Sequence, residues 1–248
     1  MGFLDYTCGM VQQNLDANIK AEKVMQSRLE TILVNMEQTL KVLKGYNGWI
    51  IGKCELCLEG GLREMNPEDY SLNILKQGRT LVLTEIRGPN EEKKEYLRVL
   101  LVKPFHLKTN GKEDTEERNA VFNKKGEICE TNSISEREFC ISAAEASHFL
   151  EKVSDYNSIH QGEQAILPGF LIMNKILKVL LHLKIICEDR FYANTKFILP
   201  LRPQEQAVLK IGPEKNGKRE ITLDLPNSMV ALRMEIRTDV QDKGSFIS

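Results

Sequence analysis

The chain lacks a strong excess of charge of either sign. Its 248 residues include 34 Lys and Arg against 35 Asp and Glu, which gives a formal net charge of -1 at pH 7. Proteins that bind nucleic acid through their overall electrostatic field have a marked basic excess. The balance of charge therefore argues against nucleic acid as a partner.

Cysteine is scarce, and the six cysteines are scattered along the chain. A chain with 42% hydrophobic residues can form a core without disulfides, so we expect reduced thiols and a cytoplasmic location. Cys54 and Cys57 have the spacing of half a zinc knuckle, but no second Cys or His pair stands at the distance that a tetrahedral site uses. No metal site is expected.

Recognisable catalytic motifs are also missing. The sequence contains no Gly-x-Ser-x-Gly elbow, no phosphate-binding loop, no dinucleotide fingerprint and no His-Glu-x-x-His pair. The four histidines, His106, His148, His160 and His182, stand apart from one another and from clustered carboxylates. We therefore predict no catalytic residues, no cofactor and no enzymatic activity.

No membrane-targeting segment is expected from the sequence. The start of the chain lacks the positive charge and apolar run of a secretory signal, so no export is expected. Residues 166–187 form the most apolar stretch, but Pro168, Gly169 and several charged residues interrupt it. That stretch is not expected to span a bilayer as a helix.

What the sequence does contain is a periodic apolar pattern in its first fifth. Seven apolar residues before Gly45 fall on two positions of a seven-residue frame: Val11, Leu15, Met25, Leu29, Ile32, Met36 and Leu43. The pattern predicts one long amphipathic helix of roughly 36 residues and about 50 Å. Because such a helix exceeds what a small core needs to cover, we expect these seven residues to bind a protein partner or a second copy of the chain.

The remainder is predicted to be an α+β body, so we divide the chain into a helix, residues 1–45, and a body, residues 46–248. Alternating and β-branched segments predict strands at residues 49–58, 80–86, 96–102, 179–187, 191–199, 207–211, 220–225 and 229–237. Helices are predicted at residues 67–77, at 170–177 and, after capping-box spacing at Ser135 and Glu138, at 139–153. Polar residues 108–132 predict a mobile loop. The expected fold is thus a long N-terminal helix followed by a mostly antiparallel sheet with one or two packed helices.

The C-terminal strands suggest a different class of protein. In residues 213–236, Leu225-Pro226, Ala231-Leu232 and Glu235-Ile236 follow a pattern that resembles the end of the gasdermin pore-forming domain. The resemblance implies binding to acidic membrane lipid and assembly into a β-barrel pore. It makes the predicted hairpin 178–199 the element that meets the membrane, with five candidate head-group contacts: Lys175, Lys178, Lys184, Arg190 and Lys196.

Two hypotheses therefore stand. The favoured one is a non-enzymatic assembly protein that binds a partner or oligomerises through its N-terminal helix as a coiled coil. The alternative is a gasdermin-like protein that binds membranes and forms pores, which would add membrane association to the cytoplasmic location.

Overall fold

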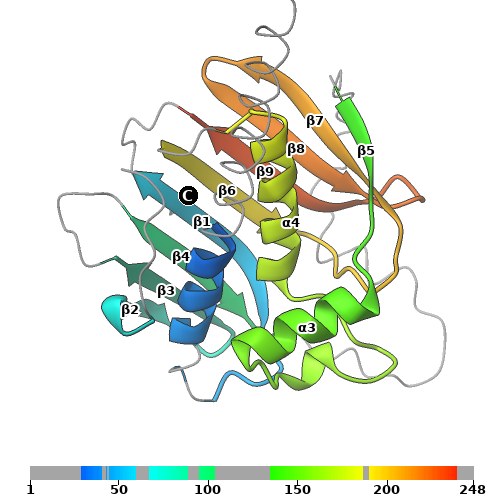
Figure 1. The fold of residues 1–248 in the computed structure, drawn as a ribbon. Helices are drawn as coiled ribbons and strands as arrows, with labels where there is room; N and C mark the ends of the chain where they lie inside the picture. The colour runs from blue at the N-terminus through cyan, green and yellow to red at the C-terminus, as the bar shows by residue number, and fades with distance from the viewer. Residues whose placement is uncertain are drawn as a thin grey trace, which may run out of the picture.

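A nine-stranded antiparallel sheet forms the centre of the molecule, with helices packed on it (Figure 1). The computed structural model describes residues 29–40, 43, 45–59, 67–88, 95–103, 135–186 and 190–238. The strand order is β2-β3-β4-β1-β6-β9-β8-β7-β5. In chain order, the strands are β1 (Ile50–Glu59), β2 (Ser71–Gln77), β3 (Leu81–Arg87), β4 (Tyr96–Val102), β5 (Ser135–Phe139), β6 (Arg190–Phe197), β7 (Ala207–Lys215), β8 (Lys218–Asp224) and β9 (Val230–Arg237).

The described helices are residues 29–40, α3 (Ala143–Val153) and α4 (Gly169–His182), with short 3-10 turns η1 (Pro67–Asp69) and η2 (Ser158–His160). Helix 29–40, drawn in dark blue, and α4 lie across the same face of the sheet (Figure 1). Among the described helices, none is both long enough and apolar enough to cross a bilayer.

The chain contains two copies of one structural unit. Helix 29–40 is followed by β1 to β4 in the spatial order β2-β3-β4-β1, and α4 is followed by β6 to β9 in the order β7-β8-β9-β6. The two units, called the first and second repeat below, meet where β1 pairs antiparallel with β6, with Leu56 opposite Ala193. The two repeats are therefore related by an approximate two-fold axis through the middle of the sheet. Strand β5 lies outside both repeats, at the edge of the sheet beside β7.

The core lies between the sheet and the helices. Alternate residues of β1, such as Cys54, Leu56 and Leu58, are buried in it, because successive strand side chains point to opposite faces. From the helices come large apolar residues that are at most 1% exposed, including Leu29, Ile32, Leu33, Met36, Phe170, Met173 and Ile176. The apolar faces of helix 29–40 and α4, called the central helices below, are therefore buried against the sheet of the same molecule.

The fold class predicted from the sequence is wrong in its main element. The described part of the predicted 11–43 helix is helical only at residues 29–40. Leu29, Ile32 and Met36 are 0%, 1% and 0% exposed. A helix that packs on a sheet repeats its apolar residues with nearly the same period as a coiled coil, so the pattern alone did not reveal the covering sheet.

Parts of the prediction fall outside the described residues or remain open. Val11, Leu15 and Met25 lie outside them, as does the predicted loop 108–132, and Leu43 is half-buried beyond the helix. The division of the chain at residue 45 stays a prediction.

Three local predictions are also wrong. Residues 71–77 form strand β2 instead of a helix, and the predicted strand 179–187 begins inside α4, which continues to His182. The residues taken for a capping box, Ser135 to Glu138, belong to strand β5. The true box lies seven residues later, where Ser142 caps α3 and Glu145 bonds back to the Ser142 backbone.

Candidate active site

The segment between α3 and α4 forms a compact polar turn in the second repeat. Helix α3 ends at Ser154, whose left-handed backbone (φ 50°) turns the chain. The Asn157 N–H donates to Asp155 Oδ1 at 2.9 Å, and the Asn157 side chain caps η2 by accepting from the Ile159 N–H at 3.4 Å. Asp and Asn favour such turns because their short side chains accept hydrogen bonds from backbone two residues on.

His160, at the end of η2, is held by a backbone carbonyl. Its Nδ1 lies 2.7 Å from the Ile166 carbonyl oxygen, and the Ile166 N–H donates to the Ile159 carbonyl at 2.9 Å. A carbonyl oxygen can only accept, so Nδ1 must carry the hydrogen. In the neutral imidazole the lone pair is then on Nε2.

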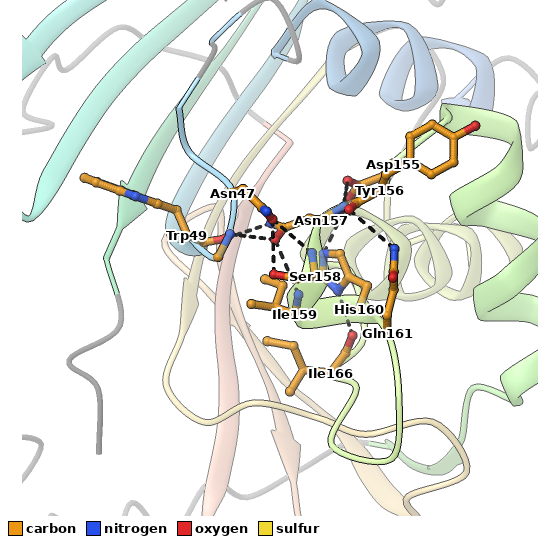
Figure 2. Close-up of polar contacts among 11 residues, drawn as sticks. Asn47, Trp49, Asp155, Tyr156, Asn157, Ser158, Ile159, His160, Gln161 and Ile166 are labelled. Carbon is orange, nitrogen blue, oxygen red and sulfur yellow. Dashed lines mark hydrogen bonds and ion pairs between the residues drawn. The ribbon is translucent and has the colours of Figure 1, made fainter. Parts of the chain in front are cut away.

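That Nε2 atom faces a carboxylate. It lies 3.5 Å from Asp155 Oδ2, and the side chains of His160 and Asp155 are 9% and 18% exposed (Figure 2). Since Asp155 Oδ1 already accepts from Asn157, Oδ2 remains for His160 or for a bound molecule. A neutral Nε2 and a carboxylate oxygen are both acceptors, so a molecule with two O–H bonds, such as water, can donate to both. The pair, called the His160–Asp155 dyad below, has the composition of a general acid–base site.

The first repeat contacts this segment through residues 46–49, the turn before β1. Asn47 Oδ1 accepts from the Ser158 N–H at 3.0 Å and from the Ser158 hydroxyl at 3.2 Å. In return, Asn157 Oδ1 accepts from the Gly48 N–H at 2.7 Å, while Asn157 Nδ2 donates to the Trp49 carbonyl at 3.2 Å. Figure 2 shows these contacts around Asn157. The dyad therefore lies at the boundary between the two repeats.

The described residues contain no metal site, and helix α4 begins a few residues after the Ile166 contact. In the described part of the chain, no three His, Cys, Asp or Glu side chains gather closely enough to hold a metal ion. Three residues after Ile166, α4 begins at Gly169 with Pro168 as its N-cap, and no side chain of that residue caps the helix. The first N–H groups of an α-helix have no partner within the helix.

Three of the five residues predicted to contact lipid form ion pairs within the chain. Lys175 contacts Glu145 of α3 at 2.9 Å, Lys178 pairs with Glu30, and Arg190 contacts Glu59 at 2.9 Å. Lys184 and Lys196 are exposed. The three ion pairs join elements of this chain, and contact of these residues with lipid is untested.

The dyad was missed in the sequence, although a signal for it is present. Asp155, Asn157 and His160 stand within six residues, but a single aspartate near a histidine is not a carboxylate cluster and does not by itself indicate a catalytic pair. A turn-forming Asp-x-Asn followed by His, directly after an amphipathic helix, places a carboxylate and an imidazole on one tight turn.

Comparison with known proteins gives a fold but no sequence family. No family model matches the chain, and no curated protein matches it. Among solved structures, HtdX from Mycobacterium tuberculosis is similar over 89% of this chain and 95% of its own, with 14% identity and a TM-score of 0.58. A MaoC-like dehydratase from Phytophthora capsici is similar over 82% of this chain and 75% of its own, with 18% identity and a TM-score of 0.53.

A further protein described as a MaoC-like dehydratase matches 86% of this chain and 82% of its own, at 10% identity and a TM-score of 0.53. At such identities the likeness establishes the fold, the hot-dog fold, in which an antiparallel sheet covers a central helix.

These findings correct the functional predictions. The gasdermin resemblance is wrong, because the fold is that of MaoC-like dehydratases. Coiled-coil assembly, membrane binding and pore formation are wrong as functions for the same reason. The expectation of a non-enzymatic protein is also wrong, since the proteins that share the fold include named dehydratases. The chain has the hot-dog fold.

Proposed function

We propose that the protein is a hydratase or dehydratase, an enzyme that adds water to a carbon–carbon double bond or removes it. The observation that carries this proposal is the His160–Asp155 dyad, with Nε2 and Oδ2 3.5 Å apart and the tautomer fixed by Ile166. The description of two solved structures with this fold as dehydratases supports it.

The chemistry of the dyad points to a substrate class. A neutral imidazole is too weak a base to exchange a proton with an ordinary C–H bond, but it can do so beside a carbonyl group, where the negative charge spreads onto oxygen. The substrate is therefore a 3-hydroxyacyl or 2-enoyl compound. A thioester is the best candidate, because a carboxylate does not acidify the neighbouring C–H bond to the same degree.

The hydration step follows from the positions of the two side chains. A water molecule donates one hydrogen to Asp155 Oδ2 and the other to His160 Nε2. Its oxygen forms a bond to the β-carbon as His160 takes the proton, and the electrons of the double bond move toward the carbonyl oxygen. The imidazolium then returns that proton to the α-carbon, while the Asp155 carboxylate stabilises the positive ring. Dehydration is the reverse, and the product contains one H and one OH more than the enoyl substrate.

The developing charge on the carbonyl oxygen needs a donor. The N-terminus of α4 has no side-chain cap from Pro168, and the first N–H groups of an α-helix have no partner within the helix. Preorganised N–H groups at a helix N-terminus stabilise negative charge. We assign this end of α4 to the carbonyl oxygen of the substrate.

The location, oligomeric state and cofactor requirement of the protein are also part of the proposal. Cys54, Cys57 and Cys140 are free thiols, which supports the expected cytoplasmic location. A homo-oligomer stays a prediction. The substrate is an acyl compound, and no cofactor enters the proposed step.

Activity is tested with 2-enoyl thioesters of several chain lengths, by the loss of absorbance of the conjugated double bond, and with 3-hydroxyacyl thioesters in the reverse direction. Replacing Asp155 with Asn or His160 with Gln should lower kcat by about 100-fold or more. His148→Gln is the matched control, because His148 is exposed on α3. Lack of turnover by the wild type across the panel, or full activity in both dyad variants, would overturn the proposal.

A further inference from the structure

We infer that the turn 46–49 of the first repeat positions the dyad of the second, with Asn47 and Gly48 as positioning residues that do not touch the substrate. This inference rests on the proposed function, because it assigns a role in that reaction. Its observation is the reciprocal set of hydrogen bonds between two asparagines and the opposite backbone.

The contacts are two-way and involve neighbouring residues of the catalytic segment. Asn47 Oδ1 accepts hydrogen bonds from the N–H and the hydroxyl of Ser158. Asn157 Oδ1 accepts from the Gly48 N–H, and Asn157 Nδ2 donates to the Trp49 carbonyl. Asn157 stands between Asp155 and His160 in sequence and bonds to both sides: its N–H donates to Asp155, and its carbonyl accepts the His160 N–H at 3.0 Å. Moving Asn157 would therefore displace both members of the dyad.

The turn can act as a template because it is itself fixed by the first repeat. The Trp49 N–H donates to the Tyr46 carbonyl at 3.0 Å, and the two rings meet edge to face with centroids 4.9 Å apart. Gln77, at the end of β2, donates to the Tyr46 hydroxyl at 3.0 Å. The hydrogen bonds thus run from the edge of the first repeat through Tyr46 and the turn to the segment that carries the dyad.

Gly48 is the residue on which this geometry depends. Its φ of +82° lies in the left-handed region, which residues with a Cβ atom rarely adopt. That conformation aims its N–H at Asn157. Gly45 has a similar φ of +91°, and neither glycine has a neighbour within 4 Å of an added Cβ, but Gly45 lies outside the turn. The two glycines form a matched pair, since alanine strains the backbone at either site and only the one at residue 48 disturbs the bond to Asn157.

The test compares Gly48→Ala with Gly45→Ala in the full chain. Because a small displacement of a catalytic pair affects the transition state more than substrate binding, Gly48→Ala should lower kcat by about 10-fold or more with little change in KM. Gly45→Ala should leave kcat within about two-fold of the wild type. Equal kcat values for the two variants would overturn the inference.

A second pair of variants covers the case in which Gly48→Ala does not fold. Asn47→Ala removes the acceptor for Ser158, and Asn73→Ala, at an exposed position on β2, is its control. Asn47→Ala should reduce kcat by several-fold and Asn73→Ala should not. Full activity of Asn47→Ala would count against the inference.

Nitrogen NMR of the His160 ring separates this inference from the proposed function. The Ile166 contact predicts a single Nδ1–H tautomer in the wild type, and loss of alignment in Gly48→Ala should populate the other tautomer while Gly45→Ala retains the wild-type signals. That result supports positioning even if the wild type turns over none of the thioesters, in which case only the proposed reaction fails. Identical ring signals in the wild type and both glycine variants would overturn the inference.

Discussion

Glu30 of helix 29–40 is ion-paired with Lys178 of α4, so opposite charges join the central helices of the two repeats. The other carboxylate oxygen of Glu30 contacts Lys152 of α3 at 2.6 Å. Burial raises the pKa of Glu30, but the hydrogen bonds and charges of the two lysines outweigh it and hold the pKa below its ordinary value of 4.5. One carboxylate thus links three helices.

Replacing Glu30 with Gln should lower the free energy of unfolding by about 1 kcal/mol at pH 7, because two lysines lose their partner at a partly exposed site. A group with a lowered folded-state pKa contributes its stability above the unfolded value, and the contribution is lost as the pH falls through the folded value. The difference between variant and wild type in urea unfolding should therefore shrink below about pH 4.5. Glu163→Gln, at an exposed position, is the control and should show no such pH dependence. A constant difference from pH 7 into acid would contradict the assignment.

Replacing Ser142 with Ala should destabilise the protein by about 1 kcal/mol, because the Ser142 hydroxyl accepts from the Glu145 N–H at 3.1 Å and caps α3. The same substitution at Ser135, in edge strand β5, removes no helix cap and should have a smaller effect. Thermal or chemical unfolding measures the loss of stability in each variant. Equal losses for Ser142→Ala and Ser135→Ala would argue against the cap.

The capping box should also persist into acid. The Ser142 backbone N–H and Lys175, which both donate to the Glu145 carboxylate, lower its pKa to about 2. Its contribution to stability is present above the ordinary pKa of 4.5 and is lost only as the pH falls toward about 2. The destabilisation caused by Glu145→Gln should therefore remain measurable at pH 4 and disappear near pH 2.

Glu85 should matter more for stability than Glu235, although each pairs with an arginine on the sheet face opposite the helices. The Glu85 side chain is 4% exposed and accepts from Arg98 Nε at 2.6 Å and from Arg87, whereas the Glu235 side chain is 36% exposed. Glu85→Gln removes a buried carboxylate that accepts from two arginines, while Arg98 keeps its contact with Glu55 at 3.6 Å and Arg87 is exposed to solvent. The variant should therefore cost about 2 kcal/mol, and Glu235→Gln at most about 1. Urea unfolding of the two variants measures the contrast, and a larger loss for Glu235→Gln would refute it.

The sequence correctly predicts strands that have one buried face and one polar face. Residues 96–102 were predicted as a strand and form β4 with the same bounds, because Leu97 and Val99 alternate with Tyr96 and Arg98. The prediction failed where burial is nearly complete. Leu180 and Leu181 of α4 are 0% and 4% exposed, so apolar residues occupy both helical and strand-like positions and periodicity cannot distinguish the two.

The site could be predicted only in part, because its contacts cross between the repeats. The Asp155-x-Asn157 turn and His160 are visible in the sequence as neighbours, but the carbonyl that fixes the His160 tautomer depends on the loop to Ile166. The bonds from Asn47 and Gly48 join residues 109 to 111 positions apart, and no local pattern reports such a contact.

The pairing of β1 with β6 joins the two repeats within a single chain. Separate half-sized chains would have to find each other, and the population of paired molecules would fall on dilution. In one chain the partner is always supplied at a high effective concentration, so this pairing is independent of how much protein is present. A reaction centre that draws its supports from both halves can therefore remain assembled at low copy number.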